Sequence, residues 1–403
     1  MGNVPKLRFE GFDGEWLEKQ LGEVITNKAK KYNPSQNSEV YKCIELEHLE
    51  SDTGRLLGHT TSLDAGSIKN RFYPNNVLFG KLRPYLNKYH QPNFDGVCSS
   101  EIWVLSGLKV SDDFAYRIVQ TPNFLALANQ SSGSKMPRAD WKVVESGTVS
   151  IPPSEREQQK IAAFLTAVDT KLEQLTQKEA LLKQYKKGVM QKIFSQEIRF
   201  KADDGSEFPE WNSLPMSELG KTFNGLTGKT GDDFGDGQPY IQYKQIFDNS
   251  KIDLVNTGLV RIVAGERQQK AKYGDVFFTT SSETPNEVAY ASVLLDQVDN
   301  LYLNSFCFGY RANSLKQLLP EFSRYYFRSE GFRREAVKLA QGSTRYNISK
   351  TELMKTIIDL PCIDEQRKIA LCLTALDDKL ELVSGQIDNA KTFKKGLLQQ
   401  MFV

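Results

Sequence analysis

The sequence predicts a mixed α/β protein built as a pseudo-twofold internal repeat, in which two globular α/β domains are separated by two long helices that form an antiparallel coiled coil. Two observations lead to this expectation. Residues 157–194 match residues 365–402 without a gap at roughly half of all positions, which is typical of a duplicated unit. Both segments carry apolar residues at alternating spacings of four and three, the pattern of a coiled-coil helix.

The repeat continues outside the two helical segments. The stretch LRFEGFDGEW from Leu7 resembles IRFKADDGSEFPEW from Ile198, and GSKMPRADW before the first helix is similar to GSTRYNISKTEL before the second. The order along the chain is therefore domain, helix, domain, helix. We expect a first globular domain over residues 1–152, a helix over 153–196, a second globular domain over 197–361 and a second helix over 362–403.

Each predicted helix is amphipathic and has a start signal. Ser154 and Glu157 have the spacing of a capping box, and Asp364 is placed to cap the second helix. The helices should run antiparallel, because they flank one domain and the ends of a domain usually lie close together. Gly188 and Gly396 occupy the same heptad position in the two copies, which indicates either close approach of another backbone or a surface glycine copied by duplication. The apolar heptad positions are Ile161, Leu165, Val168, Leu172, Leu175, Leu182, Val189 and Ile193 in the first helix and Ile369, Leu373, Leu376, Leu380, Val383, Ile387, Ala390, Leu397 and Met401 in the second.

The globular halves carry corresponding patterns of strands and helices. Residues 72–90 and 272–295 each predict a strand, a polar loop with a proline, and another strand. The later segments SSEIWVL and NSFCFGYRA predict strands, and FAYRIVQTPNFLALA and FSRYYFRSEGFRREAVKLA predict helices. Each half is therefore expected to be a mixed α/β domain of about 150 residues.

Composition narrows the class of protein. A chain of 403 residues with 39% hydrophobic residues can fill the cores of two or three soluble domains. There is no secretory leader pattern and no apolar run of about twenty residues, so we expect a cytoplasmic protein without a membrane role. The five cysteines form no CxxC and the three histidines are far apart, so no metal site is expected. The net charge of +2 means that any binding of nucleic acid must come from local clusters.

Catalytic motifs are not apparent in the sequence. The stretch GLTGKT, residues 225–230, resembles a phosphate-binding loop, but that motif needs a glycine where Phe223 stands, and turn-forming residues follow it instead of a helix. We find no dinucleotide, methyltransferase, zinc-protease or nucleophile-elbow pattern. Glu283 and Glu287 are better explained as solvated loop charges than as a nuclease site. The sequence therefore predicts no catalytic residue.

Basic and small polar residues gather in the repeated loops, and these are side-chain types that hold phosphates and read base edges. Two similar but non-identical loop platforms fixed to long helices suit a linear target in two parts, such as double-stranded DNA. The candidates in the first half are Lys81, Arg83, Tyr85, Lys88, Ser132, Ser134, Lys135 and Arg138. Those in the second half are Lys244, Thr279, Thr280, Ser281, Ser282, Thr284, Ser343, Thr344, Arg345, Tyr346 and Asn347.

A family resemblance rests on the same motifs. EQQKIAAFLTAVDTKLE with KKGVMQKIF, EQRKIALCLTALDDKLE with KKGLLQQMF, NVLFGKLRPYLNK, GDVFFTTSSETP and GSTRYNIS closely resemble the specificity subunits of type I restriction-modification systems, over essentially the whole chain. The resemblance implies that the globular halves are target recognition domains, each reading one half of a bipartite, asymmetric DNA site. It also implies that the helices are spacers that set the distance between the half-sites.

The resemblance further implies partners and cofactors. Such subunits are not catalytic. They dock two modification subunits, which use S-adenosylmethionine to methylate adenine at N6, and they assemble with restriction subunits that use ATP and magnesium to translocate and cleave DNA. Two identical modification subunits need two similar docking places, whereas two different half-sites need different loops. This agrees with a repeat that is strongest in the helices and weakest at GKLRPYLNK and TTSSETPNE.

Two hypotheses of other classes remain open from the sequence. One is a single-chain nuclease or methyltransferase, which methyl transfer by the purified chain alone would reveal. The other is a coiled-coil scaffold that does not bind DNA, which a lack of DNA binding by the assembled complex would favour.

Overall fold

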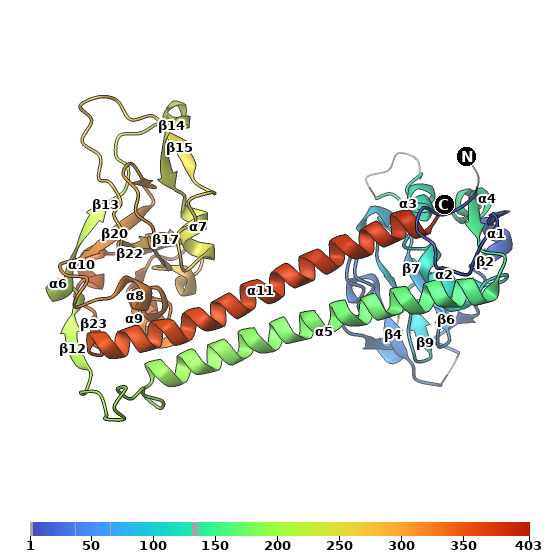
Figure 1. Ribbon diagram of the computed structural model, residues 1–403, viewed down its shortest axis with the longest axis horizontal. Helices are drawn as coiled ribbons and strands as arrows, with labels where there is room; N and C mark the ends of the chain where they lie inside the picture. The colour runs from blue at the N-terminus through green and yellow to red at the C-terminus, as the bar shows by residue number, and fades with distance from the viewer. Residues whose placement is uncertain (1–2, 37, 65, 131–135) are drawn as a thin grey trace. The chain divides into compact units, whose positions relative to one another are not determined.

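The structure is a computed structural model that describes residues 3–36, 38–64, 66–130 and 136–403 (Figure 1). It divides into two compact units: the first comprises residues 1–177 together with 384–403, and the second comprises residues 178–383. Each unit combines short helices and small sheets with parts of two long helices, which confirms the predicted mixed α/β class. Among the described helices, none is long and apolar enough to cross a membrane.

The two long helices are α5 (Glu155–Phe194) and α11 (Ile363–Met401). Within the first unit, Lys394 Nζ near the end of α11 lies 2.7 Å from a carboxylate oxygen of Asp169 on the early part of α5. Within the second unit, Lys186 late in α5 pairs with Asp377 early in α11. These two ion pairs occupy corresponding positions of the repeat. In the first unit, Trp16 also contacts both Glu157 at the start of α5 and Phe402 after the end of α11, and in the second unit Arg199, which follows α5, binds Glu365 at the start of α11. With two such contacts in each unit, the helix segments pack in opposite directions, as predicted.

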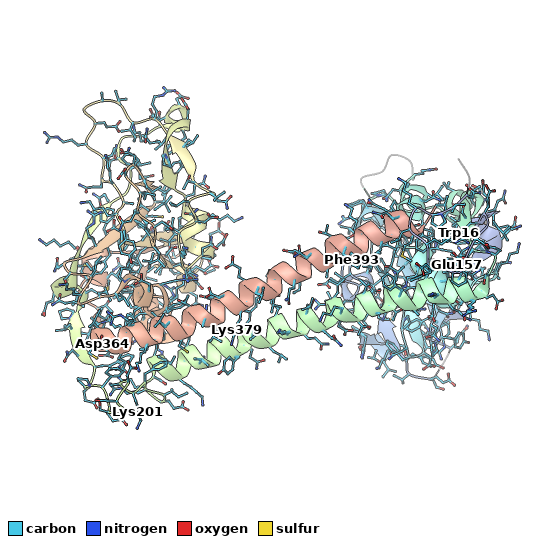
Figure 2. All side chains as sticks on the ribbon, in the orientation of Figure 1. Trp16, Glu157, Lys201, Asp364, Lys379 and Phe393 are labelled. Carbon is cyan, nitrogen blue, oxygen red and sulfur yellow. The ribbon has the colours of Figure 1, made fainter. Side chains whose placement is uncertain are left out.

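A buried carboxylate joins the start of α5 to the N-terminal segment of the first unit, where Trp16 and Glu157 lie together (Figure 2). The Glu157 side chain is 1% exposed and accepts hydrogen bonds from Arg8 Nε at 2.7 Å, from Arg8 Nη2 at 2.9 Å and from Trp16 Nε1 at 3.3 Å. Ser154 Oγ accepts the Glu157 N–H at 3.4 Å, but the carboxylate does not return the bond. The predicted capping box is wrong because the charged Arg8 donor binds this carboxylate more strongly than a neutral backbone N–H.

The second unit repeats this junction at the start of α11. The Glu365 side chain is 0% exposed, and it accepts hydrogen bonds from Arg199 Nη2 at 2.8 Å and from Trp211 Nε1 at 3.0 Å. Because a buried carboxylate is costly unless it is paired and fully hydrogen-bonded, each junction fixes the position of its helix start against the globular part of its own unit.

Asp364 does not cap α11 as predicted. It lies inside the first turn and pairs with Arg367 at 2.7 Å, while the Cys362 carbonyl accepts a backbone N–H of that turn. The helix begins at Ile363, two residues earlier than a cap at Asp364 would allow. An acidic residue in the first turn still interacts favourably with the helix dipole.

The described part of the first unit holds three sheets. A two-stranded antiparallel sheet pairs β1 (Leu17–Gln20) with β11 (Thr148–Ile151). An antiparallel sheet has the order β2 (Ile25–Thr26), β10 (Ile102–Gly107), β7 (Val77–Gly80) and β8 (Tyr89–His90). A mixed sheet has the order β3 (Lys31–Tyr32), β6 (Lys69–Phe72), β9 (Gly96–Cys98), β4 (Lys42–Ile44) and β5 (Thr60–Thr61). The short helices are α1 (Leu21–Val24), α2 (Asp112–Ile118), α3 (Pro122–Ala128), α4 (Trp141–Ser146), η1 (Leu46–His48), η2 (Ser62–Asp64) and η3 (Pro84–Leu86).

The second unit has a corresponding central sheet and terminal strand pair. The antiparallel central sheet has the order β13 (Gly220–Asn224), β20 (Cys307–Ala312), β16 (Val276–Thr279) and β18 (Ala291–Val293), and β12 (Asn212–Pro215) pairs with β23 (Ile357–Leu360). A third sheet has the order β15 (Gly258–Val260), β14 (Phe234–Ile241) and β19 (Tyr302–Leu303). A fourth sheet has the order β17 (Ser281–Ser282), β22 (Tyr346–Ile348) and β21 (Ala340–Gln341). The short helices are α6 (Met216–Leu219), α7 (Tyr243–Asp248), α8 (Pro320–Tyr326), α9 (Glu330–Lys338), α10 (Lys350–Leu353), η4 (Gly231–Asp233) and η5 (Pro285–Glu287).

The two segments predicted as helices before the glycine-serine loops are each broken into a pair. In the first unit, Thr121 Oγ1 accepts the Phe124 N–H and caps α3, which begins at Pro122. In the second unit, Ser329 Oγ accepts the Phe332 N–H and caps α9. A capping hydroxyl, here followed in one case by proline at the first helical position, starts a new helix and so ends the preceding one.

The long helices complete the core of each unit. In the first unit, the apolar cluster around the central sheet includes Ile161 and Leu165 of α5 with Leu397 and Met401 of α11. In the second unit, the corresponding cluster includes Ile193 of α5 with Ile369, Leu373 and Leu376 of α11. These predicted heptad residues therefore lie in the core of a globular unit, so the helices are integral to the folding of both units.

We predict that replacing Glu365 by alanine destabilises the second unit by about 3 kcal/mol, the usual cost of removing one partner of a buried ion pair. The change leaves the Arg199 guanidinium and the Trp211 N–H without their shared acceptor. Chemical denaturation followed by Trp fluorescence would measure the loss. Glu210→Ala is the matched control, because Glu210 faces the same guanidinium from a 92% exposed position and should leave the midpoint almost unchanged. Equal midpoints for the two variants would contradict the junction's role.

Candidate nucleic-acid interface

Backbone hydrogen bonds place three candidate segments of the first unit side by side. The Lys81 N–H donates to the Glu101 carbonyl at 2.9 Å, and the Ala139 N–H donates to the Lys81 carbonyl at 2.8 Å. The segment after β7 therefore lies between the residue that precedes β10 and the segment that precedes α4. We call residues 81–83, 101 and 136–139 platform 1.

The second unit builds the same arrangement from corresponding segments. The Thr280 N–H donates to the Phe306 carbonyl at 3.1 Å, and the Ile348 N–H donates to the Thr280 carbonyl at 2.9 Å. The pairing continues as the short ladder of β17 with β22, in which Ser281 faces Asn347. We call residues 280–282, 306 and 345–348 platform 2. The loops that the sequence singled out separately are thus brought together in each unit.

The candidate side chains of the first unit differ in availability. Arg83 and Tyr85 are exposed, with Tyr85 59% exposed, and Arg83 is held at a positive φ of 52° by the bond from its N–H to the Pro137 carbonyl at 2.8 Å. Arg138 is exposed but pairs with Glu101 at 3.0 Å, and Lys88 Nζ donates to the Leu46 carbonyl at 2.7 Å. Lys81 is half-buried. Ser132, Ser134 and Lys135 lie outside the described residues.

In the second unit, two groups of candidates can be distinguished by burial. The exposed candidates are Lys244, Thr284, Ser343, Thr344, Arg345 and Asn347, and Thr280 and Tyr346 are half-buried. Thr279, Ser281 and Ser282 are buried. Lys244 lies on α7. The residue before it on the same helix, Tyr243, donates its hydroxyl hydrogen to the Ser281 carbonyl at 2.6 Å.

Three of the candidates, Thr279, Ser281 and Ser282, are buried, and two of them use their hydroxyls inside the second unit. Thr279 Oγ1 accepts the Tyr290 N–H at 3.0 Å. The Ser282 hydroxyl donates to the Glu287 carboxylate at 2.6 Å, and this bond lowers the pKa of Glu287. Glu287 is therefore a loop carboxylate that is hydrogen-bonded within its own loop.

Two arginines of the second unit, Arg328 and Arg333, could bind phosphate by residue type, but both donate hydrogen bonds to carbonyls of their own unit. Arg328 donates to the carbonyls of Ile246, Phe247 and Asn249 at the end of α7, and burial lowers its pKa to about 10. Arg333 donates to the Ala289 carbonyl at 2.6 Å, and burial also lowers its pKa. These arginines fix α7 and the loop after platform 2.

The glycine-rich stretch at residues 225–230 is not arranged as a phosphate-binding loop. The Lys229 side chain is 6% exposed, with its ammonium 2.7 Å from Glu266 and 2.6 Å from the Arg261 carbonyl. The hydrogen bond from Lys229 is the largest cause that lowers the pKa of Glu266 to about 2. Thr230 caps the short helix η4 with Asp233. The lysine that would face a phosphate is thus occupied by a carboxylate.

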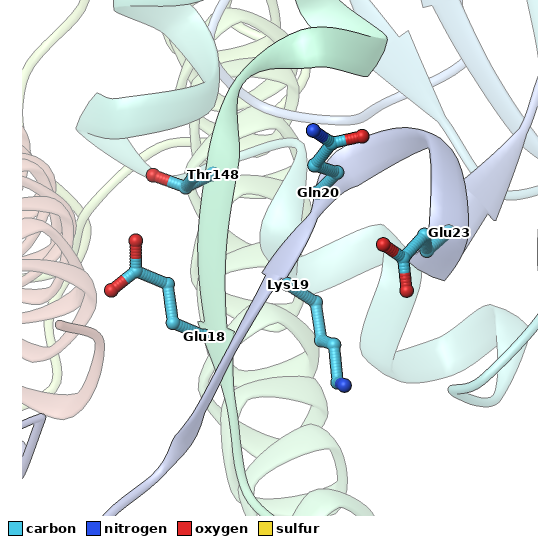
Figure 3. Close-up of a pocket in the computed structure, with 5 residues that line it drawn as sticks. All are labelled: Glu18, Lys19, Gln20, Glu23 and Thr148. Atoms are coloured by element: carbon cyan, nitrogen blue, oxygen red, sulfur yellow. The ribbon is translucent and has the colours of Figure 1, made fainter.

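A shallow polar pocket lies beside the paired strands β1 and β11 (Figure 3). Its lining side chains are Glu18, Lys19, Gln20, Glu23 and Thr148, and they do not converge on one point in the close-up. Glu23 is engaged by Lys109 at 2.7 Å, which lowers its pKa. Among the described residues, no group of three or more His, Cys, Asp or Glu side chains is placed to hold a metal ion. The platforms are therefore the better candidates for a site.

Sequence reasoning missed Glu101 and Phe306, the third member of each platform. Glu101 accepts the Arg138 guanidinium, whereas Phe306 is 62% exposed. Both residues lie inside segments that the sequence predicted as strands, immediately before the first residue of the observed strand, and their place in the repeat was the available signal.

Comparisons with known proteins show similarity along most of the chain. The family model of the type I restriction modification DNA specificity domain matches residues 14–184 and 210–392. The MjaVIII type I restriction enzyme specificity subunit of Methanocaldococcus jannaschii is 24% identical over 313 residues, which cover 72% of this chain and 69% of that protein. The EcoDI specificity subunit of Escherichia coli is 28% identical over 157 residues, covering 38% of this chain and 35% of the relative.

Solved structures show the same fold over the whole chain. A structure from work on complex assembly and conformational transition of the type I R-M system has a TM-score of 0.60 at 19% identity, with 96% of each chain covered. The S subunit of a type I restriction-modification system from M. genitalium has a TM-score of 0.57 at 13% identity, with 99% of each chain covered.

We predict that Gly342→Ala destabilises the second unit by about 1–3 kcal/mol and loosens the segment that leads to platform 2. Gly342 has a φ of +127°, and a Cβ there would lie 2.2 Å from the Arg345 carbonyl oxygen. Gly331→Ala in α9 is the control, since its Cβ would meet nothing within 4 Å and alanine favours a helix. Hydrogen exchange of the Ile348 amide, which bonds to Thr280, should accelerate only in the Gly342 variant. Unchanged exchange would show that the strain is absorbed elsewhere.

Proposed function

The chain belongs to the family of the type I restriction modification DNA specificity domain, and from this premise we propose that it is the DNA sequence-recognition subunit of a type I restriction-modification complex. Each globular domain reads one half of a bipartite, asymmetric site. The observation that carries this proposal is the pair of platforms, which share one backbone hydrogen-bond pattern but present different side chains. A scaffold would not need two such platforms, and the relatives that match are named specificity subunits rather than enzymes.

The functional division that we propose is reader, helix, reader, helix. The readers are residues 1–152 and 197–361, and the helical segments 153–196 and 362–403 set the spacing of the half-sites and dock the methyltransferase subunits. In the first reader, Arg83 in platform 1 and Tyr85 close to it in sequence are exposed candidates. In the second reader, the exposed candidates in platform 2 are Arg345 and Asn347. Arginine suits phosphate or guanine, and asparagine suits the edge of adenine.

The proposed partners are double-stranded DNA, two modification subunits and restriction subunits. S-adenosylmethionine, ATP and magnesium would be bound by those partner subunits, and this chain would direct their chemistry without taking part in it. The complex would act in the cytoplasm, where chromosomal DNA is accessible to it.

Two exposed aromatic residues support a pair of equivalent docking places. Tyr185 on α5 is 61% exposed, and Phe393 at the corresponding position of α11 is 56% exposed. Gly188 and Gly396 follow three residues later on the same face of each helix, and among the described atoms nothing lies within 4 Å of a Cβ built on either. Among the described residues, neither glycine is therefore approached closely by another backbone. An aromatic anchor beside an open glycine suits a helix of a partner, and its repetition suits two copies of one partner.

The experiment that tests the function is a map of N6-methyladenine in a host free of such methylation, expressing this chain with its modification subunit. We expect one motif of two short specified blocks separated by a fixed run of unspecified bases. Arg345→Ala should relax or weaken only the block read by the second unit, by about 1–3 kcal/mol if Arg345 reads a base. Methylation with no two-block motif, or methylation that persists without this chain, would reject the proposal.

We predict that Tyr185→Ala and Phe393→Ala each remove one of two modification subunits from the complex, and that the double variant removes both. Loss of an aromatic anchor should weaken each docking place at least about tenfold. Native mass spectrometry would report the stoichiometry. Leu382→Ala is the control, because Leu382 is 64% exposed on α11 but the repeat places the polar Gln174 at its counterpart. Full occupancy in the double variant would place the docking surface elsewhere.

A further inference from the structure

The two platforms differ in chemistry at one corresponding position, which is residue 101 in platform 1 and residue 306 in platform 2. Position 101 in platform 1 is a glutamate that forms an ion pair with Arg138 at 3.0 Å, with the glutamate side chain 26% exposed and the arginine side chain 56% exposed. The corresponding position in platform 2 is Phe306, which is 62% exposed. Equivalent backbone atoms thus present a charged pair in one unit and an apolar ring in the other.

The exposed ring stands on a fixed backbone. The Phe306 N–H donates to Asn304 Oδ1 at 2.8 Å, and its carbonyl accepts the Thr280 N–H at 3.1 Å. Gly225 packs against the same turn, since a Cβ there would lie 2.0 Å from the Asn304 carbonyl oxygen. Both polar backbone groups of Phe306 are therefore bonded, and the platform holds the backbone from which its exposed side chain projects. An apolar ring held in water on a rigid support is prepared for contact with an apolar group of a ligand.

The residues next to Phe306 indicate which apolar group of a DNA ligand the ring would contact. Thr280 joins Phe306 to the strand that carries Asn347, an exposed amide next to the buried Ile348. Amide side chains bond the N6 and N7 edge of adenine in the major groove, and apolar side chains contact the C5-methyl group of thymine in the same groove. A wedge between base pairs would instead act from the minor groove, where an amide distinguishes only A·T from G·C pairs.

We propose that Phe306 is a specificity-determining residue that contacts the C5-methyl group of a thymine in the half-site read by the second unit. This inference rests on the proposed function. At the corresponding place in the first unit, the Glu101–Arg138 pair offers hydrogen-bonding groups only, so the two readers select differently at a shared backbone position.

The test uses the complex of this chain with its modification subunit and synthetic duplexes that carry the mapped site. Each thymine of the second half-site is replaced in turn by deoxyuridine, which lacks only the methyl group. At one position the wild-type complex should bind about fourfold more weakly, the factor expected for burial of one methyl group. Phe306→Ala should weaken binding to the thymine duplex, and it should lose no further affinity when that thymine becomes deoxyuridine.

Val255→Ala is the control variant, because Val255 is 89% exposed on the same unit but lies in a loop outside platform 2. It should keep the deoxyuridine sensitivity of the wild type. Three outcomes would overturn the inference: a second half-site without thymine, wild-type binding that no deoxyuridine changes, or Phe306→Ala binding that is as deoxyuridine-sensitive as the wild type. Absence of any two-block motif for the wild type would instead reject the proposed function, and the inference would fall with it.

Discussion

The buried carboxylate at the start of each long helix is the constraint on which the rest of each unit depends. Glu157 and Glu365 are almost wholly removed from solvent, and each is held by an arginine and a tryptophan from the segment that opens its globular part. A buried carboxylate without these donors would be strongly unfavourable, so the helix, the opening segment and the strand pair between them must assemble together. The same arginine, tryptophan and glutamate contacts occur in both units. The duplication has therefore kept this three-residue junction as well as the helical pattern.

The joint also explains why the helices contribute to the cores. Once the helix start is fixed, the heptad stripe faces the aromatic cluster of its unit, as Ile161 and Leu165 do in the first and Ile369 and Leu373 do in the second. The end of the other helix completes the same cluster. Its direction is set by the ion pairs of Asp169 with Lys394 and of Lys186 with Asp377. Burial lowers the pKa of Lys394, and the Asp169 carboxylate opposes that effect, so the pair is held where neither charge could be left alone.

Sequence reasoning predicted the parts that rest on periodicity and repetition: two α/β units, two long helices, their antiparallel packing within each unit, and the loops that meet in each platform. It failed where contacts span long sequence separations. The Arg8–Glu157 pair joins residues 149 positions apart, so Glu157 was mistaken for a capping residue. Thr279, Ser281 and Ser282 have the composition of contact residues, but only the fold shows that strand pairing buries them. Phe306 drew no attention because it lies in a segment predicted as a strand, where an apolar residue usually enters a core, and its exposure depends on the turn that precedes the observed strand.

The platforms show how a duplicated fold can acquire two specificities. Their registers are fixed by backbone bonds that do not depend on side-chain identity, and a slip of one residue would exchange buried for exposed positions, so the register is strongly constrained. Residues can therefore change without loss of the register at the exposed positions of the platforms and at the residues that pack under them. One such support is the last residue of the strand before each platform. Gly80 stands there in the first unit, where a Cβ would lie 2.9 Å from Leu46 Cδ2, whereas Thr279 in the second unit uses its hydroxyl to hold the Tyr290 N–H. The two loops after the platforms are therefore anchored differently, and divergence in recognition follows from local support without any change in the shared backbone pattern.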